Sequence, residues 1–309
     1  MLKDAGMDRI MKKARELKIV IPAFNVAYLP MLKPIADALK ENQSFGLVEV
    51  ARPDVEKFGA ISYRAVVEEY HKYAHPQYMR LHLDHVPVID EDGNRVDWEA
   101  LIRQGIDLGF DSVMIDGSRL PLEENIAVTK KVVEMAHAKK IPVEAELGAV
   151  LGHEKGPLPP YEELFSTGKG FTEPEEAKKF VSETGVDWLS VAIGNIHGAI
   201  SGAAKDSTKI AARLNIDHLK KLRDETGIPL VLHGGSGIAR EYVLEGIRNG
   251  ISKINVGTEI RQAYERGLKE REGNIPYAQE KVFQKMNELI CDYYGIKGSA
   301  LKLDRAIVL

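Results

Sequence analysis

Short apolar segments recur along this chain, and longer amphipathic segments separate them. We expect strands at residues 19–26, 45–51, 78–86, 112–118, 142–148, 188–194, 228–235 and 251–257. Several of these segments are apolar runs without clean alternation, which is typical of strands that are buried on both faces. The intervening segments, such as residues 122–140 and 173–185, carry the apolar spacing of amphipathic helices.

Eight β/α units in one chain predict a single α/β domain over residues 1–309, folded as a (β/α)8 barrel, or TIM barrel. The alternative is an open, doubly wound sheet. Such a sheet would need a glycine-rich fingerprint after its first strand to bind a nucleotide, and residues 22–30, PAFNVAYLP, contain no glycine. The closed barrel is therefore favoured.

Two segments exceed what a minimal barrel needs. Residues 151–171 are rich in Gly and Pro, and we expect them to form a long loop after the fifth strand. Loops of this length are usually functional or disordered. Residues 260–309 are longer than one closing helix, so we expect a C-terminal helical extension with more than one helix. This extension is a candidate contact between subunits.

Composition narrows the class of protein. The 42 basic and 46 acidic side chains are well mixed and leave a net charge of −4, which argues against a nucleic-acid partner. The single cysteine, Cys291, excludes an intramolecular disulfide and a cysteine-rich zinc cluster, so any metal must be bound by His and carboxylate side chains. No signal-peptide segment opens the chain and no apolar run reaches about 18 residues, so we expect a cytoplasmic protein without a membrane partner.

Polar side chains gather at the carboxyl ends of the predicted strands, the rim where (β/α)8 barrels place their active sites. They are Asn25, Asp84, His85, Asp116, Ser118, Glu146, His197, His233 and Asn255. A single histidine at such a position is most often a hydrogen-bonded residue of the fold. Three histidines on one rim, with three carboxylates beside them, favour a functional site.

The candidate metal ligands are the three histidines of this rim. His85, His197 and His233 follow the third, sixth and seventh strands, so they can converge across the mouth of the barrel. Three imidazoles with an open fourth position are typical of a catalytic zinc site. The other six histidines lie in helical or linking segments, in the long loop or on the opposite face of the third strand; they are His71, His75, His82, His137, His153 and His218.

Glycine-rich segments follow the last three strands, with the sequences GNIHGAISG at 194–202, HGGSG at 233–237 and NVGTE at 255–259. Loops after the last two strands of a (β/α)8 barrel often bind phosphate through backbone N–H groups. Glycine allows close approach of the backbone, and Ser236 and Thr258 add hydroxyl donors. The joint pattern favours a phosphate site over three unrelated turns.

Six motifs in order carry a resemblance to a known family. HLDH (82–85), SVMIDGS (112–118), VEAELG (143–148), VAIGNIHG (191–198), LHGGSG (232–237) and KINVGTE (253–259) have the order and spacing of the class II, metal-dependent fructose-bisphosphate aldolases. That family includes tagatose-bisphosphate and related ketose-phosphate aldolases. The resemblance covers about residues 19–260. It implies reversible retro-aldol cleavage of a ketose 1-phosphate or ketose 1,6-bisphosphate to dihydroxyacetone phosphate and an aldehyde.

The resemblance also implies roles for the reactive groups of the site. His85, His197 and His233 would bind the catalytic Zn²⁺. Asp84 would exchange a proton with the hydroxyl at the cleaved carbon. Glu154, in the loop at 151–171, would be the base for the dihydroxyacetone phosphate carbon.

Other matched positions would support the metal and the substrate. Asp116 and Glu146 match acidic residues that hold the metal in an alternative position. Asn25 and Asn255 match residues that contact the substrate. The 1-phosphate site, where the family often also holds a monovalent cation (Na⁺ or K⁺), would comprise Gly198, Gly234, Ser236 and Thr258.

The Asp-His pair at the end of the third strand predicts a local irregularity. Successive side chains of a strand point to opposite faces, so Asp84 and His85 cannot both face the barrel mouth from a regular strand. We therefore expect irregular backbone at residues 84–86, next to Pro87.

Departures from the family pattern concern the far end of the substrate. Gly257 stands where fructose-bisphosphate members usually carry an aspartate, and Ala51 and Arg52 stand near a position where a serine often binds a second phosphate. Arg261 keeps the arginine that family members use, in the helix after the eighth strand, to bind a second phosphate. Arg52 and Arg261 are therefore candidates to bind an anion at the far end of the substrate. An alternative substrate is thus a ketose 1-phosphate whose far end is a sulfonate, a carboxylate or neutral.

A different class of function stays open, because a chain of this kind can be a noncatalytic aldolase-like subunit. Retention of Asp84, the three histidines and Glu154 argues against a degenerate scaffold. The resemblance also implies a homodimer or homotetramer.

Overall fold

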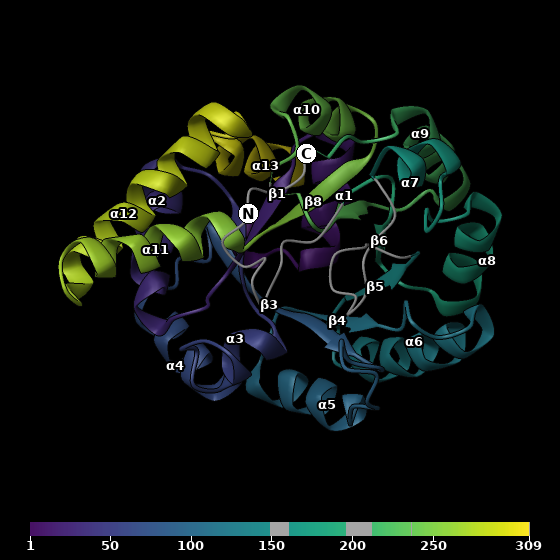
Figure 1. Ribbon diagram of the computed structural model, residues 1–309, viewed down its shortest axis with the longest axis horizontal. Coiled ribbons are helices and arrows are strands. Elements are labelled where there is room, and N and C mark those ends of the chain that lie inside the picture. Colours follow the sequence, from purple (N-terminus) through teal and green to yellow (C-terminus); the bar gives the residue numbers. More distant parts are fainter. Residues whose placement is uncertain (149–160, 196–211, 236, 309) are drawn as a thin grey trace.

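The computed structural model describes residues 1–148, 161–195, 212–235 and 237–308. In this part of the chain, eight parallel strands close into one barrel in the order in which they occur in the sequence (Figure 1). The strands are β1 (Ile21–Asn25), β2 (Gly46–Val50), β3 (Met79–Pro87), β4 (Ser112–Asp116), β5 (Val143–Leu147), β6 (Trp188–Val191), β7 (Leu230–Leu232) and β8 (Ile251–Val256). Each lies within or beside a segment that the hydrophobic pattern predicts, and the (β/α)8 prediction is confirmed.

Helices surround this barrel on the outside (Figure 1). Those before the tail are α1 (Met7–Leu17), α2 (Leu32–Glu41), α3 (Arg52–Glu56), α4 (Tyr63–Tyr73), α5 (Trp98–Leu108), α6 (Leu122–His137), α7 (Tyr161–Thr167), α8 (Pro174–Thr184), α9 (Ile216–Thr226) and α10 (Arg240–Arg248). Two short 3₁₀ helices, Leu2–Asp4 and Leu29–Met31, precede α1 and α2. Within the described ranges, no helix has the length and apolar character needed to cross a membrane.

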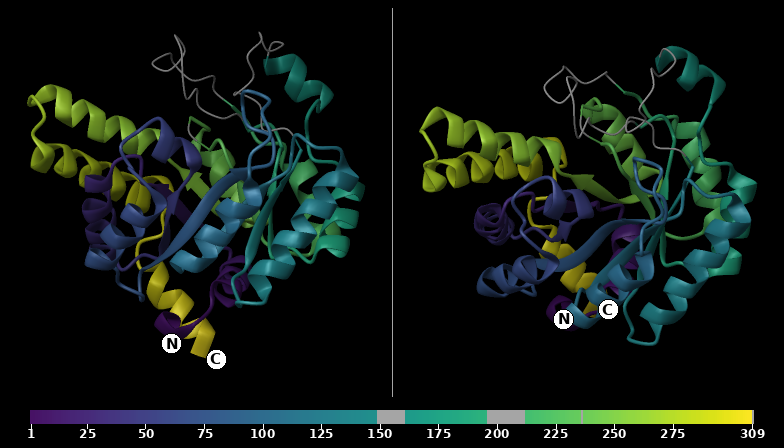
Figure 2. Two further views of the ribbon diagram at one scale, coloured as in Figure 1. Left: turned by 90° about the horizontal axis from the view of Figure 1, so that it is seen from below. Right: turned by 60° about the horizontal axis from the view of Figure 1, so that its bottom comes forward.

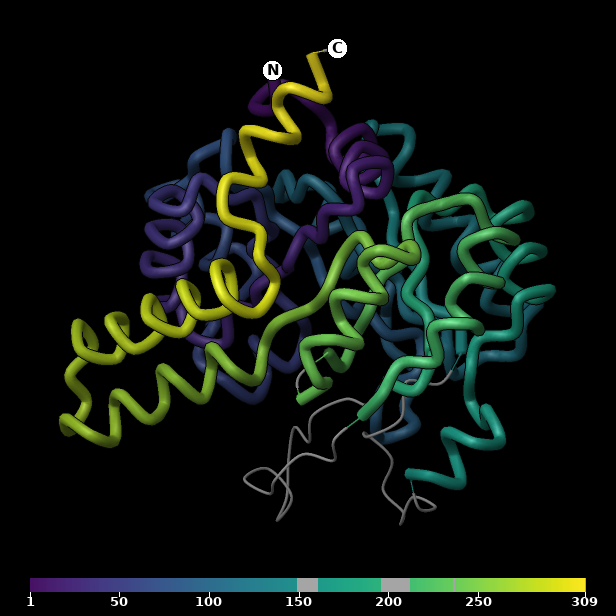
Figure 3. The backbone as a smooth tube through the Cα atoms, turned by 90° about the horizontal axis from the view of Figure 1, so that it is seen from above, coloured from purple at the N-terminus to yellow at the C-terminus, as the bar shows by residue number. Residues whose placement is uncertain are grey.

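The tail forms several helices, as the sequence predicts. They are α11 (Thr258–Glu270), α12 (Ile275–Asn287), the π-helical turn Glu288–Tyr293 and α13 (Ser299–Val308). The α11 and α12 helices pack against each other, and α12 also packs on α2. Figure 3 shows this pair extending away from the barrel, while both chain termini lie together at another side.

The interior of the barrel is divided into an apolar end and a polar end. Ala23, Leu47 and Val231 belong to an inner apolar cluster that also includes side chains of α1 and α13. These two helices therefore close the amino-terminal end of the barrel, where Figure 2 places both chain termini. Because side chains alternate along a strand, the residues two positions further along face the same interior.

The polar end of the barrel begins two residues after Ala23, Leu47 and Val231, and it holds many titratable groups. Buried polar side chains on the interior face of the strands include Glu49, His82, Asp84, Glu144, Glu146, Ser190, His233 and Lys253. Charged groups are rarely buried without partners, because removal from water is costly. The carboxyl half of the barrel is thus specialised for interactions among polar groups.

The segment predicted as a loop at residues 151–171 is partly helical, so that prediction is wrong for residues 161–167, which form α7. The Tyr161 hydroxyl donates to the Gly194 carbonyl at 3.0 Å and accepts from the Arg213 backbone N–H at 2.6 Å. These long-range hydrogen bonds hold the start of α7, which local Gly and Pro content does not reveal. Residues 151–160 lie outside the described residues.

Candidate active site

A bulge at the end of β3 brings Asp84 and His85 to the barrel mouth together. Leu83 pairs with Val113 on β4, but Val86 pairs with Ile115, so β3 has one residue more than β4 over this stretch. His85 takes up the irregularity with a φ of 39°, which is uncommon for a residue other than glycine. The predicted irregularity at residues 84–86 is confirmed, and it turns an outward position inward.

The two described histidines of the predicted metal site are in direct contact. His85 Nε2 lies 2.6 Å from His233 Nδ1, although the residues are 148 positions apart in the chain. A carboxylate lies behind each ring: Glu144 Oε1 is 2.8 Å from His233 Nε2, and Asp116 Oδ2 is 3.4 Å from His85 Nδ1. Carboxylates in this position commonly orient metal-binding imidazoles, so both rings present their remaining nitrogen to a shared point.

The donor set around these rings fits a metal ion. Ligand atoms of Asp84, His85 and His233 all lie within 4.8 Å of one another, and the same holds for His85, Asp116 and Glu146. Imidazole nitrogens and carboxylate oxygens are the donors that zinc uses in sites without cysteine. The two groups share His85, as expected if the metal has two neighbouring positions. The third predicted histidine ligand, His197, lies outside the described residues.

Burial and neighbouring charge strongly perturb these groups. Burial alone lowers the pKa of His85, but the carboxylates of Asp84, Glu146 and Asp116 raise it to about 10. Burial, and then the charge of Asp116, raise the pKa of Glu146 to about 8. Burial, and then His85, lower the pKa of His233. A cation among these groups favours their deprotonated forms, which are the forms that bind metal.

Asp84 is held by two asparagine side chains. Asn255 Nδ2 donates to Asp84 Oδ1 at 2.9 Å, and Asn25 Nδ2 donates to Asp84 Oδ2 at 3.2 Å. Burial alone raises the pKa of Asp84, but His85 and then Lys253 lower it below its ordinary value. An ionised carboxylate with both oxygens oriented is suited to accept a proton from a nearby hydroxyl.

The candidate phosphate residues fall partly within the described structure. Gly234 follows β7 with a φ of 64°, and Thr258 is the first residue of α11, directly after β8. These strands are neighbours, with Leu232 paired to Ile254. The N-terminus of a helix presents unpaired N–H groups, so this corner of the rim is suited to an anion. Gly198 and Ser236 lie outside the described residues, as does the loop residue Glu154.

The two arginines predicted to bind the far end of the substrate already have anionic partners. Arg52 Nε lies 3.3 Å from Glu56 Oε2, and its Nη2 lies 3.3 Å from Asp90 Oδ2. The Nη1 of Arg261 donates to both carboxylate oxygens of Glu265, at 2.8 and 2.7 Å. Any second anion of a substrate must compete with these carboxylates.

Sequence reasoning missed the buried residues that lie beneath the site, chiefly Glu144 and Lys253. Each stands two positions before a residue that was singled out, Glu146 and Asn255. The alternation of strand side chains places such pairs on the same interior face, so this signal was present in the sequence. His82 was assigned to the face opposite His85, but the bulge brings both into the interior, where His82 Nδ1 lies 2.8 Å from Ser112 Oγ.

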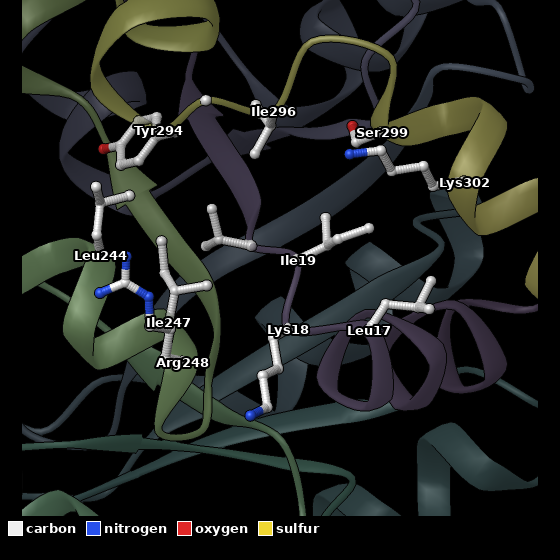
Figure 4. Close-up of a pocket in the computed structure, with 12 residues that line it drawn as sticks. Leu17, Lys18, Ile19, Leu244, Ile247, Arg248, Tyr294, Ile296, Ser299 and Lys302 are labelled. Carbon is white, nitrogen blue, oxygen red and sulfur yellow. The ribbon is translucent and has the colours of Figure 1, made fainter.

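A separate cavity of about 340 Å³ lies at the opposite, amino-terminal end of the strands (Figure 4). Its walls come from the end of α1, from α10 and from the chain around α13, with Lys18, Arg248 and Lys302 among the lining residues. None of the predicted site residues lines it, and we do not assign the active site there.

Comparisons with known proteins show the family of this chain. The family model described as "Fructose-bisphosphate aldolase class-II" matches residues 5–301. Fructose-bisphosphate aldolases of Geobacillus stearothermophilus and Giardia intestinalis are 34% and 35% identical to this chain, covering 86% and 82% of it and 84% and 79% of their own lengths. The crystal structure of the YdjI aldolase from Escherichia coli K12 is 29% identical, with a TM-score of 0.75 over 96% of this chain and 99% of that chain. The chain therefore belongs to the class II fructose-bisphosphate aldolase family.

Proposed function

We propose that this protein is a zinc-dependent aldolase. It cleaves a ketose 1-phosphate or ketose 1,6-bisphosphate reversibly to dihydroxyacetone phosphate and an aldehyde. The observation that carries the proposal is the bulge at the end of β3, which places the carboxylate of Asp84 beside the contacting imidazoles of His85 and His233. A barrel that only folds has no need for this strained arrangement.

Asp84 acts as the proton acceptor in cleavage. It takes the proton from the hydroxyl at the carbon whose bond breaks, while Asn25 and Asn255 hold its two oxygens in place. Zn²⁺, when bound by His85, His197 and His233, supplies the Lewis acid that stabilises negative charge beside the carbonyl group.

Further proposed roles belong to residues around this centre. Glu154 exchanges the proton at the dihydroxyacetone phosphate carbon. Asp116 and Glu146 bind the metal in a second position. The 1-phosphate is held by Gly234 and Thr258, which lie at the corner between β7 and α11, and by Gly198, Ser236 and a monovalent cation (Na⁺ or K⁺).

Recognition of the substrate depends mainly on the 1-phosphate. A Cβ atom at residue 257 would lie 3.1 Å from Asn25 Oδ1. Because residue 257 is glycine, no side chain is present beside Asn25 to bind the sugar hydroxyls. Arg52 and Arg261 accept a second anion only in exchange for their present carboxylates. This competition applies to every anionic far end. Ala51 and Gly257 replace the groups that would read the second phosphate and the sugar hydroxyls. For that reason fructose 1,6-bisphosphate is not expected to be the best substrate, and a ketose 1-phosphate with a sulfonate, carboxylate or neutral far end is the alternative.

A substrate panel tests the proposal. Purified protein is assayed for release of dihydroxyacetone phosphate from fructose 1,6-bisphosphate, tagatose 1,6-bisphosphate and ketose 1-phosphates with the other three kinds of far end. Metal content is measured, and chelator-treated protein serves as the control. No cleavage of any substrate by zinc-loaded protein would favour the noncatalytic subunit. A kcat/KM near 10⁵ M⁻¹ s⁻¹ or above for fructose 1,6-bisphosphate, ahead of the others, would refute the specificity argument.

We further propose a cytoplasmic homodimer or homotetramer that binds neither nucleic acid nor membrane. The helical pair of α11 and α12 extends from the barrel and supports a role in subunit contact (Figure 3). The mass of the protein in solution at micromolar concentration tests the assembly, and a monomeric mass would contradict it.

A further inference from the structure

A fully buried lysine lies beneath the proposed active site. The side chain of Lys253, on β8, has no exposed surface. Its Nζ atom lies 2.6 Å from Asn255 Oδ1, 2.9 Å from Glu144 Oε2 and 3.4 Å from Glu49 Oε2. A lysine ammonium has three N–H donors and no acceptor, so all of its polar contacts must be to oxygen atoms. The hydrogen bond to Asn255 and the ion pairs with Glu144 and Glu49 make a buried charge tolerable inside the barrel.

The first partner connects Lys253 to Asp84. An asparagine amide has one oxygen that accepts and one nitrogen that donates, and the two ends have nearly the same shape. Because the ammonium of Lys253 only donates, the oxygen of Asn255 must face it. The Asn255 nitrogen then faces Asp84 Oδ1, to which it donates at 2.9 Å. Lys253 thus determines which end of Asn255 meets Asp84.

The second partner connects Lys253 to His233. Glu144 Oε2 accepts hydrogen bonds from Lys253 and, at 2.7 Å, from Trp188 Nε1. The other carboxylate oxygen of Glu144 lies 2.8 Å from His233 Nε2. A carboxylate at this position requires the proton of the ring to be on Nε2, so Nδ1 is the nitrogen that faces His85. Lys253 therefore supports the tautomer of His233 that metal binding needs.

We infer that Lys253 is a positioning residue that orients two functional groups at once. It acts on Asp84 through Asn255 and on His233 through Glu144, and it touches neither substrate nor metal in this role. The inference rests on the proposed function for the part that concerns Asp84. The part that concerns His233 depends only on metal binding.

The test compares Lys253→Met with Trp188→Phe. The first variant removes the charged donor to Glu144 Oε2 at similar length, and the second removes only the neutral donor to the same oxygen. Zinc affinity is measured on metal-free protein by competition with a chelator, and folding by circular dichroism. The kinetic constants kcat and KM are measured with the sugar phosphate of the panel that the wild-type protein cleaves best. We expect Lys253→Met to bind zinc about 10-fold more weakly, the lower end of the range that is typical when a direct partner of a metal ligand is lost, because Glu144 stays in place. We also expect kcat to fall more than KM changes, with smaller effects in Trp188→Phe.

A double variant separates positioning from a general structural role. If Lys253 acts on the metal through Glu144, Lys253→Met should weaken zinc binding little further once Glu144→Gln is present. Independent, additive losses would overturn the inference, as would folded Lys253→Met protein with wild-type zinc affinity and kcat. If Lys253→Met does not fold, Lys253→Gln is measured in the same way, and wild-type zinc affinity there overturns the inference.

The outcomes also distinguish this inference from the proposed function. A wild-type protein that binds zinc but cleaves no sugar phosphate would refute the function, and the zinc affinity of the Lys253 variants would still decide the His233 part. If the wild-type protein is active and the Lys253 variants have wild-type zinc affinity and kcat, the proposed function stands and the inference is refuted.

Discussion

Replacing Asp84 by asparagine exchanges one carboxylate oxygen for an NH2 group at the centre of the site. The native carboxylate accepts one hydrogen bond on each oxygen, from Asn25 and Asn255. An asparagine side chain of the same shape has only one oxygen. Whichever way its amide is turned, its NH2 group faces the NH2 group of one of the two neighbouring asparagines.

This mismatch sets the expected size of the effect. One hydrogen bond worth about 1 kcal/mol is lost, and a buried donor left without a partner costs about 1–3 kcal/mol more. Because Asp84 is 2% exposed, water does not readily repair the loss. We therefore expect Asp84→Asn to lower the free energy of unfolding by roughly 2–4 kcal/mol. Loss of a proton acceptor should also lower kcat by about 10²- to 10⁴-fold.

Urea denaturation, zinc content and the rate of sugar phosphate cleavage are measured together on Asp84→Asn. Asp37→Asn is the matched control, because Asp37 is an exposed carboxylate whose partner is the exposed Lys33. That variant should retain stability and activity. Cleavage at the wild-type rate by zinc-loaded Asp84→Asn would remove Asp84 from proton transfer. Unchanged stability would refute the hydrogen-bond argument.

Three further predictions concern the metal, pH and the loop. His233→Ala should lose zinc binding to metal-free protein, while the helical His71→Ala should not; equal retention by both would contradict the ligand assignment. Burial, and then Asp84, raise the pKa of Asp54 from 3.8 to about 7. The folded protein therefore holds this proton more tightly than the unfolded chain, and the free energy of unfolding should decrease as the pH rises from about 4 to about 7. The decrease should be smaller in Asp54→Asn, and urea unfolding curves at several pH values across that range measure both. Glu154→Ala should lose proton exchange into dihydroxyacetone phosphate, followed by NMR in deuterated water, and should keep its zinc.

Strand positions and the polar rim were predictable because their signals are local. Apolar runs of suitable length mark the strands, and the carboxyl end of each strand is defined by its own sequence. The irregularity at Asp84 and His85 was also predictable, since two adjacent functional residues cannot face one side of a regular strand. Residues 161–167 were not, because hydrogen bonds from Tyr161 to distant chain segments hold the start of α7.

Closure of the barrel decided which interior side chains contact one another. The sequence by itself determined that Glu144 and Lys253, though overlooked, share the interior face with Glu146 and Asn255, because alternation along a regular strand is a property of neighbouring residues. It did not determine that Lys253 on β8 would contact Glu144 on β5, or that Glu144 would lie behind His233, the residue directly after β7. These contacts join strands that are distant in sequence and that are not paired in the sheet, since β5 pairs with β4 and β6. They depend on the curvature that brings opposite walls of the barrel within reach of a side chain, which only the tertiary structure supplies.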